Sequence, residues 1–418
     1  MTLLLGLLLT LRLTHARADT VPLGLAELLR AAGSNFDVAV ARSGLDAARA
    51  DVLAADHAPL PQLTLKSSQM DLQHGLGGGN LFTDKRIDKS LGVDWTWERG
   101  NKRALRTAAA QAAAQAASGD LADVRRQQLG LALSAGVDLA AAQQRVDEVG
   151  QLKRSADELL AAMRTRHRAG DISAQDLARA EIETSRAGID LAGAEADRRR
   201  ASLALARLVG RGQDDLAVDV TVWPSAKAAE PLDEAQRAAA VARRADVQAA
   251  EARVQAAQAT LDGAVAGRQS DLTWGVSVDH FPGTSNKLVE LRLQMPLQIG
   301  YTQQGEIGRA RAQLQQAQDL AARARLMAEA DLNQAWLDLQ ASGATLAVHQ
   351  TELIPKVRQV LAQAELAYQK GALPLTDLID ARRSLRAAVL DALAARADHA
   401  RAAGAWALLT DPDSANLP

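Results

Sequence analysis

The chain has 418 residues and a formal net charge of −2, without the clustered positive charge that a nucleic-acid surface requires. It has no cysteine, which excludes disulfides, zinc-thiolate sites, a thiol nucleophile and a lipid anchor on an N-terminal cysteine. Hydrophobic residues make up 48% and aromatic residues only 3%, because alanine dominates, and this predicts long helices packed at close range.

Residues 1–18 have the pattern of a secretory signal peptide. The apolar run Thr2 to Leu11 is followed by Ala16-Arg17-Ala18, whose small residues suit cleavage before Asp19. No Lys or Arg precedes the run and Arg12 interrupts its end, so a mis-assigned start codon and a buried N-terminal helix stay open as explanations. No later run of 18 apolar residues follows, so a membrane could be crossed only by strands.

The next segment predicts a helix and two strands. The helix runs from about Leu25 to Asp56 and is stopped by Pro59 and Pro61. The strands are expected at about 62–73 and 87–97, because apolar and polar residues alternate there. In the second strand the apolar positions are Ile87, Leu91, Val93, Trp95 and Trp97, with Lys89 as the exception.

A very long helix follows, from about Arg103 to Arg166. Its roughly 64 residues would reach about 95 Å. Near its end, apolar residues repeat at coiled-coil spacing (Val149, Leu152, Ala156, Leu159 and Met163). A turn and a returning helix complete the first repeat, residues 19–210. The Gly- and Pro-containing segment 211–232 is a linker.

The second repeat, residues 233–410, has the same order of elements, and 411–418 form a tail. We expect a helix from about Asp233 to Arg268, strands at about 271–281 and 287–297, and a long helix from Gln304 to Gln369. Pro355 lies inside this helix and should kink it.

The two halves are an internal duplication. The segment His167-Arg168-Ala169-Gly170-Asp171-Ile172-Ser173-Ala174-Gln175-Asp176-Leu177 aligns with a segment that begins at Tyr368, 201 positions later. Trp97-Glu98-Arg99-Gly100 and Leu297-Gln298-Ile299-Gly300 each end a strand-like run and open a long helix.

The strands are the main guide to function. Four amphipathic strands need cover for their apolar faces, and the helices are too long and too alanine-rich to fold back over them. Lipid can cover them, but lipid forbids open sheet edges, so several copies must close one barrel. Aromatic residues near strand ends suit the membrane interface, although rings that fill a core are the alternative (Trp95, Trp97, Trp274 and Phe281).

The architecture and the turn motifs resemble the TolC-like outer-membrane efflux family over nearly the whole chain. The most specific pieces are Tyr368-Gln369-Lys370-Gly371 with Asp377-Leu378-Ile379-Asp380, and Trp97-Glu98-Arg99-Gly100-Asn101-Lys102-Arg103. The last piece is similar to the helix-opening segment of the heavy-metal (cobalt-zinc-cadmium type) branch, except that Asn101 stands where a second Gly is usual.

This resemblance implies a mainly α fold with a membrane β-barrel segment. Three copies would form an α-helical barrel, plus a 12-stranded β-barrel with four strands per chain, in the cell outer membrane with a long periplasmic extension. Such a channel passively conducts substrates from an inner-membrane resistance-nodulation-division type pump and a periplasmic adaptor. It implies outer-membrane lipid as the surroundings, and neither a cofactor nor a nucleic-acid partner.

The resemblance also assigns residues. It places Asp377 and Asp380 at the pore constriction and Asp176 in a latch between tip helices, whereas Leu373 stands where some members have Arg. Adaptor contacts fall on the two turns (Ala169, Gly170, Asp171, Ile172, Ser173, Lys370, Gly371, Ala372, Leu373 and Pro374). The residues alone favour a local role, in which Asp377 and Asp176 stabilise the starts of their helices.

Other classes have less support. No His is spaced with a second ligand as in a metal site, and no triad or phosphate-binding loop appears, so an enzyme is not expected. A periplasmic or cytosolic coiled-coil scaffold would explain the long helices, but neither the alternating strands nor the duplication. The sequence does not indicate whether the exported substrate is a metal ion or a drug.

Overall fold

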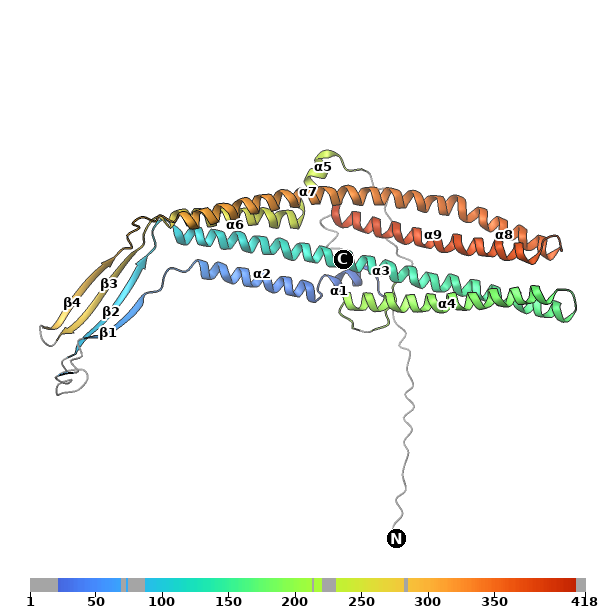
Figure 1. Cartoon of the computed structure of the whole chain (residues 1–418), viewed down its shortest axis with the longest axis horizontal. Helices are drawn as coiled ribbons and strands as arrows, with labels where there is room; N and C mark the ends of the chain where they lie inside the picture. Colours follow the sequence, from blue (N-terminus) through green and yellow to red (C-terminus); the bar gives the residue numbers. More distant parts are fainter. Residues whose placement is uncertain are drawn as a thin grey trace, which may run out of the picture.

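The computed structural model describes residues 22–68, 73, 87–212, 214–219, 231–281 and 285–410. The molecule is long and narrow, with a small sheet at one end, parallel bundles of helices along its length and two helical turns at the other end (Figure 1). The predicted signal peptide, most of the linker, most of both strand-connecting loops and the tail lie outside the described residues.

The first predicted helix is two helices, α1 (Leu25–Ala32) and α2 (Phe36–Ala55). The chain turns at residues 33–35, where Asn35 caps α2 by accepting a hydrogen bond from the Val38 N–H. The Asn35 side chain also donates to Gln128 at 2.8 Å, which ties the break to the long helix beside it. The apolar periodicity of the sequence continues through residues 33–35, so the periodicity alone did not predict that the helix is broken there.

One antiparallel sheet is formed by β1 (Gln62–Ser68), β2 (Asp88–Trp97), β3 (Leu272–Phe281) and β4 (Ser285–Gln294), in that order. The two halves of the chain therefore meet along β2 and β3. The strand β4 ends three residues before the predicted position 297. Pro296 has no N–H to donate to a ladder, and Met295 and Leu297 are left beyond the sheet.

The first long helix is α3 (Lys102–Arg168), and its 67 residues span about 100 Å. It is paired along its whole length, first with α2 and then with α4 (Ala174–Leu208), which lie end to end beside it (Figure 1).

The second half repeats this arrangement with two interruptions. The predicted helix at 233–268 is α5 (Glu234–Arg243) and α6 (Ala245–Ala266), because Arg244 is extended and buried between Asp246 and Asp331. Beyond β4, α7 (Gln304–Val348) passes through a π-helical turn, η1 (His349–Leu353), into α8 (Ile354–Gln369). Pro355 is the second residue after the π turn, so the helix is disturbed where the sequence predicted. The helix α9 (Leu375–Thr410) returns beside α8 and α7.

The interior is built mainly from alanine and leucine at helix contacts. A cluster at mid-length joins α1, α3 and α4 to the segment after α4, where Leu23 and Val218 form a parallel bridge. A second cluster lies at the helical turns and joins all four helices that meet there. These two clusters hold the long helices at a fixed register, which positions the tips.

Candidate functional site

The two helical turns, which we call the tips, have the same backbone geometry. Gly170 and Gly371 have φ of +84° and +72°, the left-handed conformation that ends a helix and favours glycine. The amide of the following residue returns to the helix in both, from Asp171 to Arg166 O and from Ala372 to Ala367 O, each at 2.9 Å. The duplication seen in the sequence is thus a repeated helix-stop geometry.

At the first tip, Asp176 takes part in a local contact. Ser173 caps α4 by accepting from the Asp176 N–H at 3.0 Å, and its hydroxyl donates to the Asp176 carboxylate at 2.8 Å. Within the described chain this fits the helix-start role of Asp176. A latch to a neighbouring copy requires a second chain and stays a prediction.

At the second tip, Asp377 and Asp380 lie on the exposed side of the first turns of α9. Leu375, Leu378 and Ile379 occupy the buried side and pack into the tip cluster. Asp377 accepts a hydrogen bond from the neighbouring Thr376 hydroxyl, and Asp380 lies 3.5 Å from the Arg383 guanidinium. The two carboxylates therefore share one exposed face, as their spacing predicts.

The first and second tips are fastened to each other by Tyr368. Its hydroxyl accepts from Arg166 Nη1 at 3.2 Å and donates to Met163 Sδ at 3.5 Å, while the Arg166 guanidinium lies 5.7 Å from the ring centre. These contacts join the ends of α3 and α8.

Ion pairs between α4 and α9 extend this connection away from the tips. Arg383 donates to Glu183, with Nε 3.2 Å from Oε2, and Arg386 pairs with Asp190. The hydrogen bond from Arg383 holds the pKa of Glu183 below its ordinary value, against the opposing effect of burial. Between these pairs and the tip cluster lies a cavity of about 370 Å³, lined by all four helices.

The sheet has one exposed apolar face. Its side chains form rows across the strands: Leu65, Leu91, Val278 and Val289 in one, and Leu63, Val93, Val276 and Leu291 in the next. Trp95, Trp97 and Trp274 are exposed at the end of this face that leads to the helices, whereas Phe281 is half-buried at the opposite end. The predicted aromatic residues thus divide between the two ends of the strands.

The other face of the sheet is polar, and its centre is occupied by Arg292. The guanidinium crosses β3 to reach Asp94 at 3.0 Å, and Asp94 also accepts from Thr64 at 2.7 Å. A Cβ at Gly275 would collide with the Asp94 carboxylate and lie 3.0 Å from Arg292 Nε. Glycine at this position therefore leaves room for the Arg292 side chain to cross β3 and reach Asp94. We expect Ser277 on this face to be sensitive to substitution, since it is only 2% exposed.

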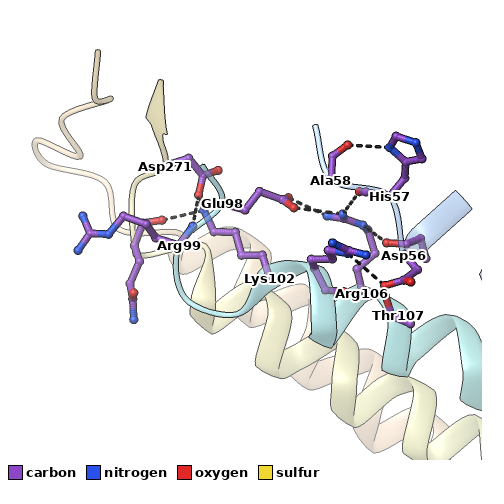
Figure 2. Close-up of polar contacts among 12 residues, drawn as sticks. Asp56, His57, Ala58, Glu98, Arg99, Lys102, Arg106, Thr107 and Asp271 are labelled. Carbon is purple, nitrogen blue, oxygen red and sulfur yellow. Dashed lines mark hydrogen bonds and ion pairs between the residues drawn. The ribbon is translucent and has the colours of Figure 1, made fainter. Parts of the chain in front are cut away.

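Where the sheet meets the helices, a polar junction joins four elements (Figure 2). Asp271 accepts from the Arg99 N–H at 2.9 Å and from Lys102 Nζ at 2.7 Å, which links β3 to the start of α3. Arg106 donates to both Glu98 oxygens and to the carbonyl oxygens of Ala55 and His57.

At this junction, α3 is preceded by two residues in the left-handed backbone conformation. Gly100 and Asn101 have φ of +73° and +59°, so the two residues before α3 are both left-handed. Asparagine tolerates this conformation better than most residues, and so it can stand in the place of a second glycine. The hydrogen bond from Arg103 lowers the pKa of the nearby Asp56 carboxyl, and Thr107 also donates to it.

The contacts between the two halves were not predicted from sequence. Arg383 and Glu183 are separated by 200 positions, and Arg166 and Tyr368 by 202. These separations are close to the offset of the duplication because equivalent helices of the two repeats face each other. A comparison of opposite charges within one residue of that offset would have found the Glu183–Arg383 pair.

Among the described residues, no group of three metal-ligating side chains is placed to hold an ion. None of the described helices combines the length and the apolar character needed to cross a bilayer.

Comparison with known proteins shows which proteins the chain resembles. Residues 28–211 match the sequence model of the outer membrane efflux protein family. The chain is 27% identical over 369 residues to the cobalt-zinc-cadmium resistance protein CzcC of Cupriavidus metallidurans, covering 86% of this chain and 83% of that protein.

Solved structures have the same fold. A membrane protein from Pseudomonas aeruginosa has a TM-score of 0.80 at 18% identity, over 94% of this chain and 93% of that one. CusC, described as forming a transmembrane channel, has a TM-score of 0.79 at 19% identity, over 94% and 92%. The open-state outer membrane channel MtrE of Neisseria gonorrhoeae has 0.76 at 18%, over 92% and 88%.

The fold is therefore that of these solved outer-membrane channels, with long paired helices and one four-stranded antiparallel sheet. The first half of the chain thus matches the model of the outer membrane efflux protein family, and the similarity to CzcC extends over most of the chain.

Proposed function

We propose that three copies of this chain form the exit duct of a tripartite efflux system in the outer membrane. The observation that carries the proposal is the sheet, whose apolar face is exposed over all four strands. Its outer strands, β1 and β4, each have one unpaired edge. An open edge is unfavourable in lipid, and three copies joined edge to edge would close twelve strands into one barrel.

The helices supply the rest of the duct. All four strands join their helices at the same end of the sheet, so the helices extend on one side of the membrane, the periplasm (Figure 1). With about 100 Å of helix, each chain would reach far towards the inner membrane. The tips at residues 169–173 and 370–374 are exposed at the far end and would contact a periplasmic adaptor and, through it, an inner-membrane pump.

The narrowest point would lie at Asp377 and Asp380. Threefold symmetry would repeat their shared exposed face around the axis as a ring of carboxylates. Such a ring concentrates cations and repels anions. Conduction through it would be passive, with no covalent step.

Divalent metal cations are the substrate class that we propose. This rests on the likeness to CzcC, which is named as a cobalt-zinc-cadmium resistance protein, and on the acidic face at the second tip. Deleting the gene should raise the cobalt, zinc and cadmium retained by cells, and a plasmid copy should restore it. Unchanged metal content with greater drug retention would assign drugs as the substrate, and no change in either would contradict an efflux role.

A further inference from the structure

At the far end of the sheet from the helices, the apolar face ends in a row of basic side chains. In register, Ser67 pairs with Lys89 and Lys89 pairs with His280. On β4 the strand alternation that exposes Val289, Leu291 and Leu293 places Lys287 on the same face, next to the irregular pairing around His280. We call Lys89, His280 and Lys287 the basic row.

The basic row continues the apolar face directly. Lys89 is two residues from Leu91, so the basic row is one step beyond the row of Leu65, Leu91, Val278 and Val289. Trp97, at the opposite end, marks the side from which the helices leave. The exposed face is therefore asymmetric, with tryptophans towards the periplasm and cations towards the outside.

Lys89 has no ionic neighbour of its own. Its Nζ is buried and has no hydrogen-bond partner, within the described part of the chain. An ammonium group removed from water needs an opposite charge or several acceptors. Lys287 is exposed, and the ion pairs of β4 within the described residues are made by Arg292.

The height of the apolar face puts this ammonium close to the hydrocarbon. From Trp97 to Leu91 the strand rises about 20 Å, and strand tilt reduces the height across the membrane further. Outer-membrane barrels have an apolar band about 25 Å tall. Lys89 therefore lies at or just inside the outer edge of that band, where its long side chain can turn out from the buried position of its Nζ and reach a headgroup.

We propose that the basic row binds the phosphate groups of the phosphorylated glycolipid in the outer leaflet of the outer membrane. The inference rests on the proposed membrane location. Two ammonium groups on β2 and β4, with the His280 imidazole on β3 between them, match a headgroup that carries more than one phosphate. Charge-assisted hydrogen bonds to phosphate are stronger than neutral ones. Zwitterionic phospholipid offers one phosphate with its own counter-charge and fits less well.

The test is glycolipid retention by the purified oligomer. The protein is extracted from outer membranes in mild detergent, and the glycolipid bound per oligomer is measured by mass spectrometry, followed by titration with bisphosphorylated lipid A. The double variant Lys89→Gln/Lys287→Gln should bind lipid A up to about a hundredfold more weakly, because each lysine lost removes a charge-assisted hydrogen bond that corresponds to about tenfold. The Arg/Arg double variant should retain binding.

Lys66→Gln is the matched control. Lys66 pairs with Ser90 on the polar face at nearly the same height, so it removes one positive charge without touching the basic row. Equal binding by the Gln/Gln variant and the Lys66 variant would overturn the proposal, as would equal binding of lipid A and its dephosphorylated form. If the Gln/Gln variant does not assemble, the lipid A comparison on the unaltered protein still decides. Absence of the protein from the outer-membrane fraction would instead contradict the proposed function.

Discussion

Placing one charge on the apolar face of the sheet should prevent stable insertion. Leu291 is 78% exposed and lies in the row that includes Val93 and Val276, near the middle of the apolar face. If that face contacts lipid, Leu291→Arg puts a guanidinium near the midplane. In a protein whose exposed face contacts water, the same change would be nearly neutral, so the variant separates the two cases.

The expected loss of stability depends on how deep in the bilayer the arginine lies. Arginine on the lipid face of a barrel costs about 2–4 kcal/mol at the midplane and about 0–1 kcal/mol near the interfaces. Each of three chains carries the change, so the closed barrel would lose roughly 6–12 kcal/mol if the effects add. That loss is comparable to the whole stability of many domains.

The assay is urea unfolding in lipid vesicles, together with the amount of folded oligomer in the outer membrane. The control, Gln294→Arg, adds the same group on the opposite face of the same strand, at an exposed position. The Leu291 variant should show the large loss and the Gln294 variant a small one. Equal unfolding midpoints for the two variants would refute the assignment of the apolar face to lipid.

Three further outcomes are expected. The Asp377→Asn/Asp380→Asn double variant should assemble but lose cation selectivity and block by multivalent cations in planar-bilayer recordings, and unchanged selectivity would return both residues to a helix-capping role. The lowered pKa of Glu183 means that the folded state favours the ionised carboxylate. The Glu183–Arg383 pair should therefore stabilise the helices at neutral pH, and this stabilisation should be lost as acid protonates Glu183. The backbone amides of α4 and α9 near this pair should therefore exchange hydrogen faster on acidification in the unaltered protein. This pH dependence should be weaker in Glu183→Gln, and identical pH profiles for the two proteins would contradict this role. Ser173→Ala should cost about 1 kcal/mol at the first turn of α4, read as faster exchange of the Asp176 amide, with the second tip unaffected as the internal reference.

The repeating features of this fold were well predicted from the sequence, whereas the local breaks in its helices and strands were not. Strand alternation and heptad spacing act over ten or more residues, so they predicted β2, β3 and α3 almost to their ends. The break at Asn35 and the extended Arg244 depend on single contacts with distant helices, to Gln128 and Asp331, which no local pattern reveals. The early end of β4 was readable from Pro296, whose missing N–H outweighs the alternation that continues past it.

The candidate site divides in the same way. The tip glycines, Asp377 and Asp380 follow from local spacing and lie where that spacing predicts. The contacts of Tyr368 and Arg383 need the two repeats to be set side by side, and the Arg292 path over Gly275 needs three strands in register. Such contacts become predictable only once the duplication is treated as a symmetry of the fold.

The most direct test of the membrane-spanning duct uses the absence of cysteine from the chain. Gln73→Cys lies between β1 and β2, beyond the far end of the sheet, and Ala372→Cys lies at the second tip, and both positions are exposed. In intact cells a maleimide that cannot cross membranes should label the first variant and not the second. After the outer membrane is permeabilised, both should be labelled. Equal labelling of the two variants in intact cells, or labelling of neither before permeabilisation, would contradict a chain that spans the outer membrane with its helices in the periplasm.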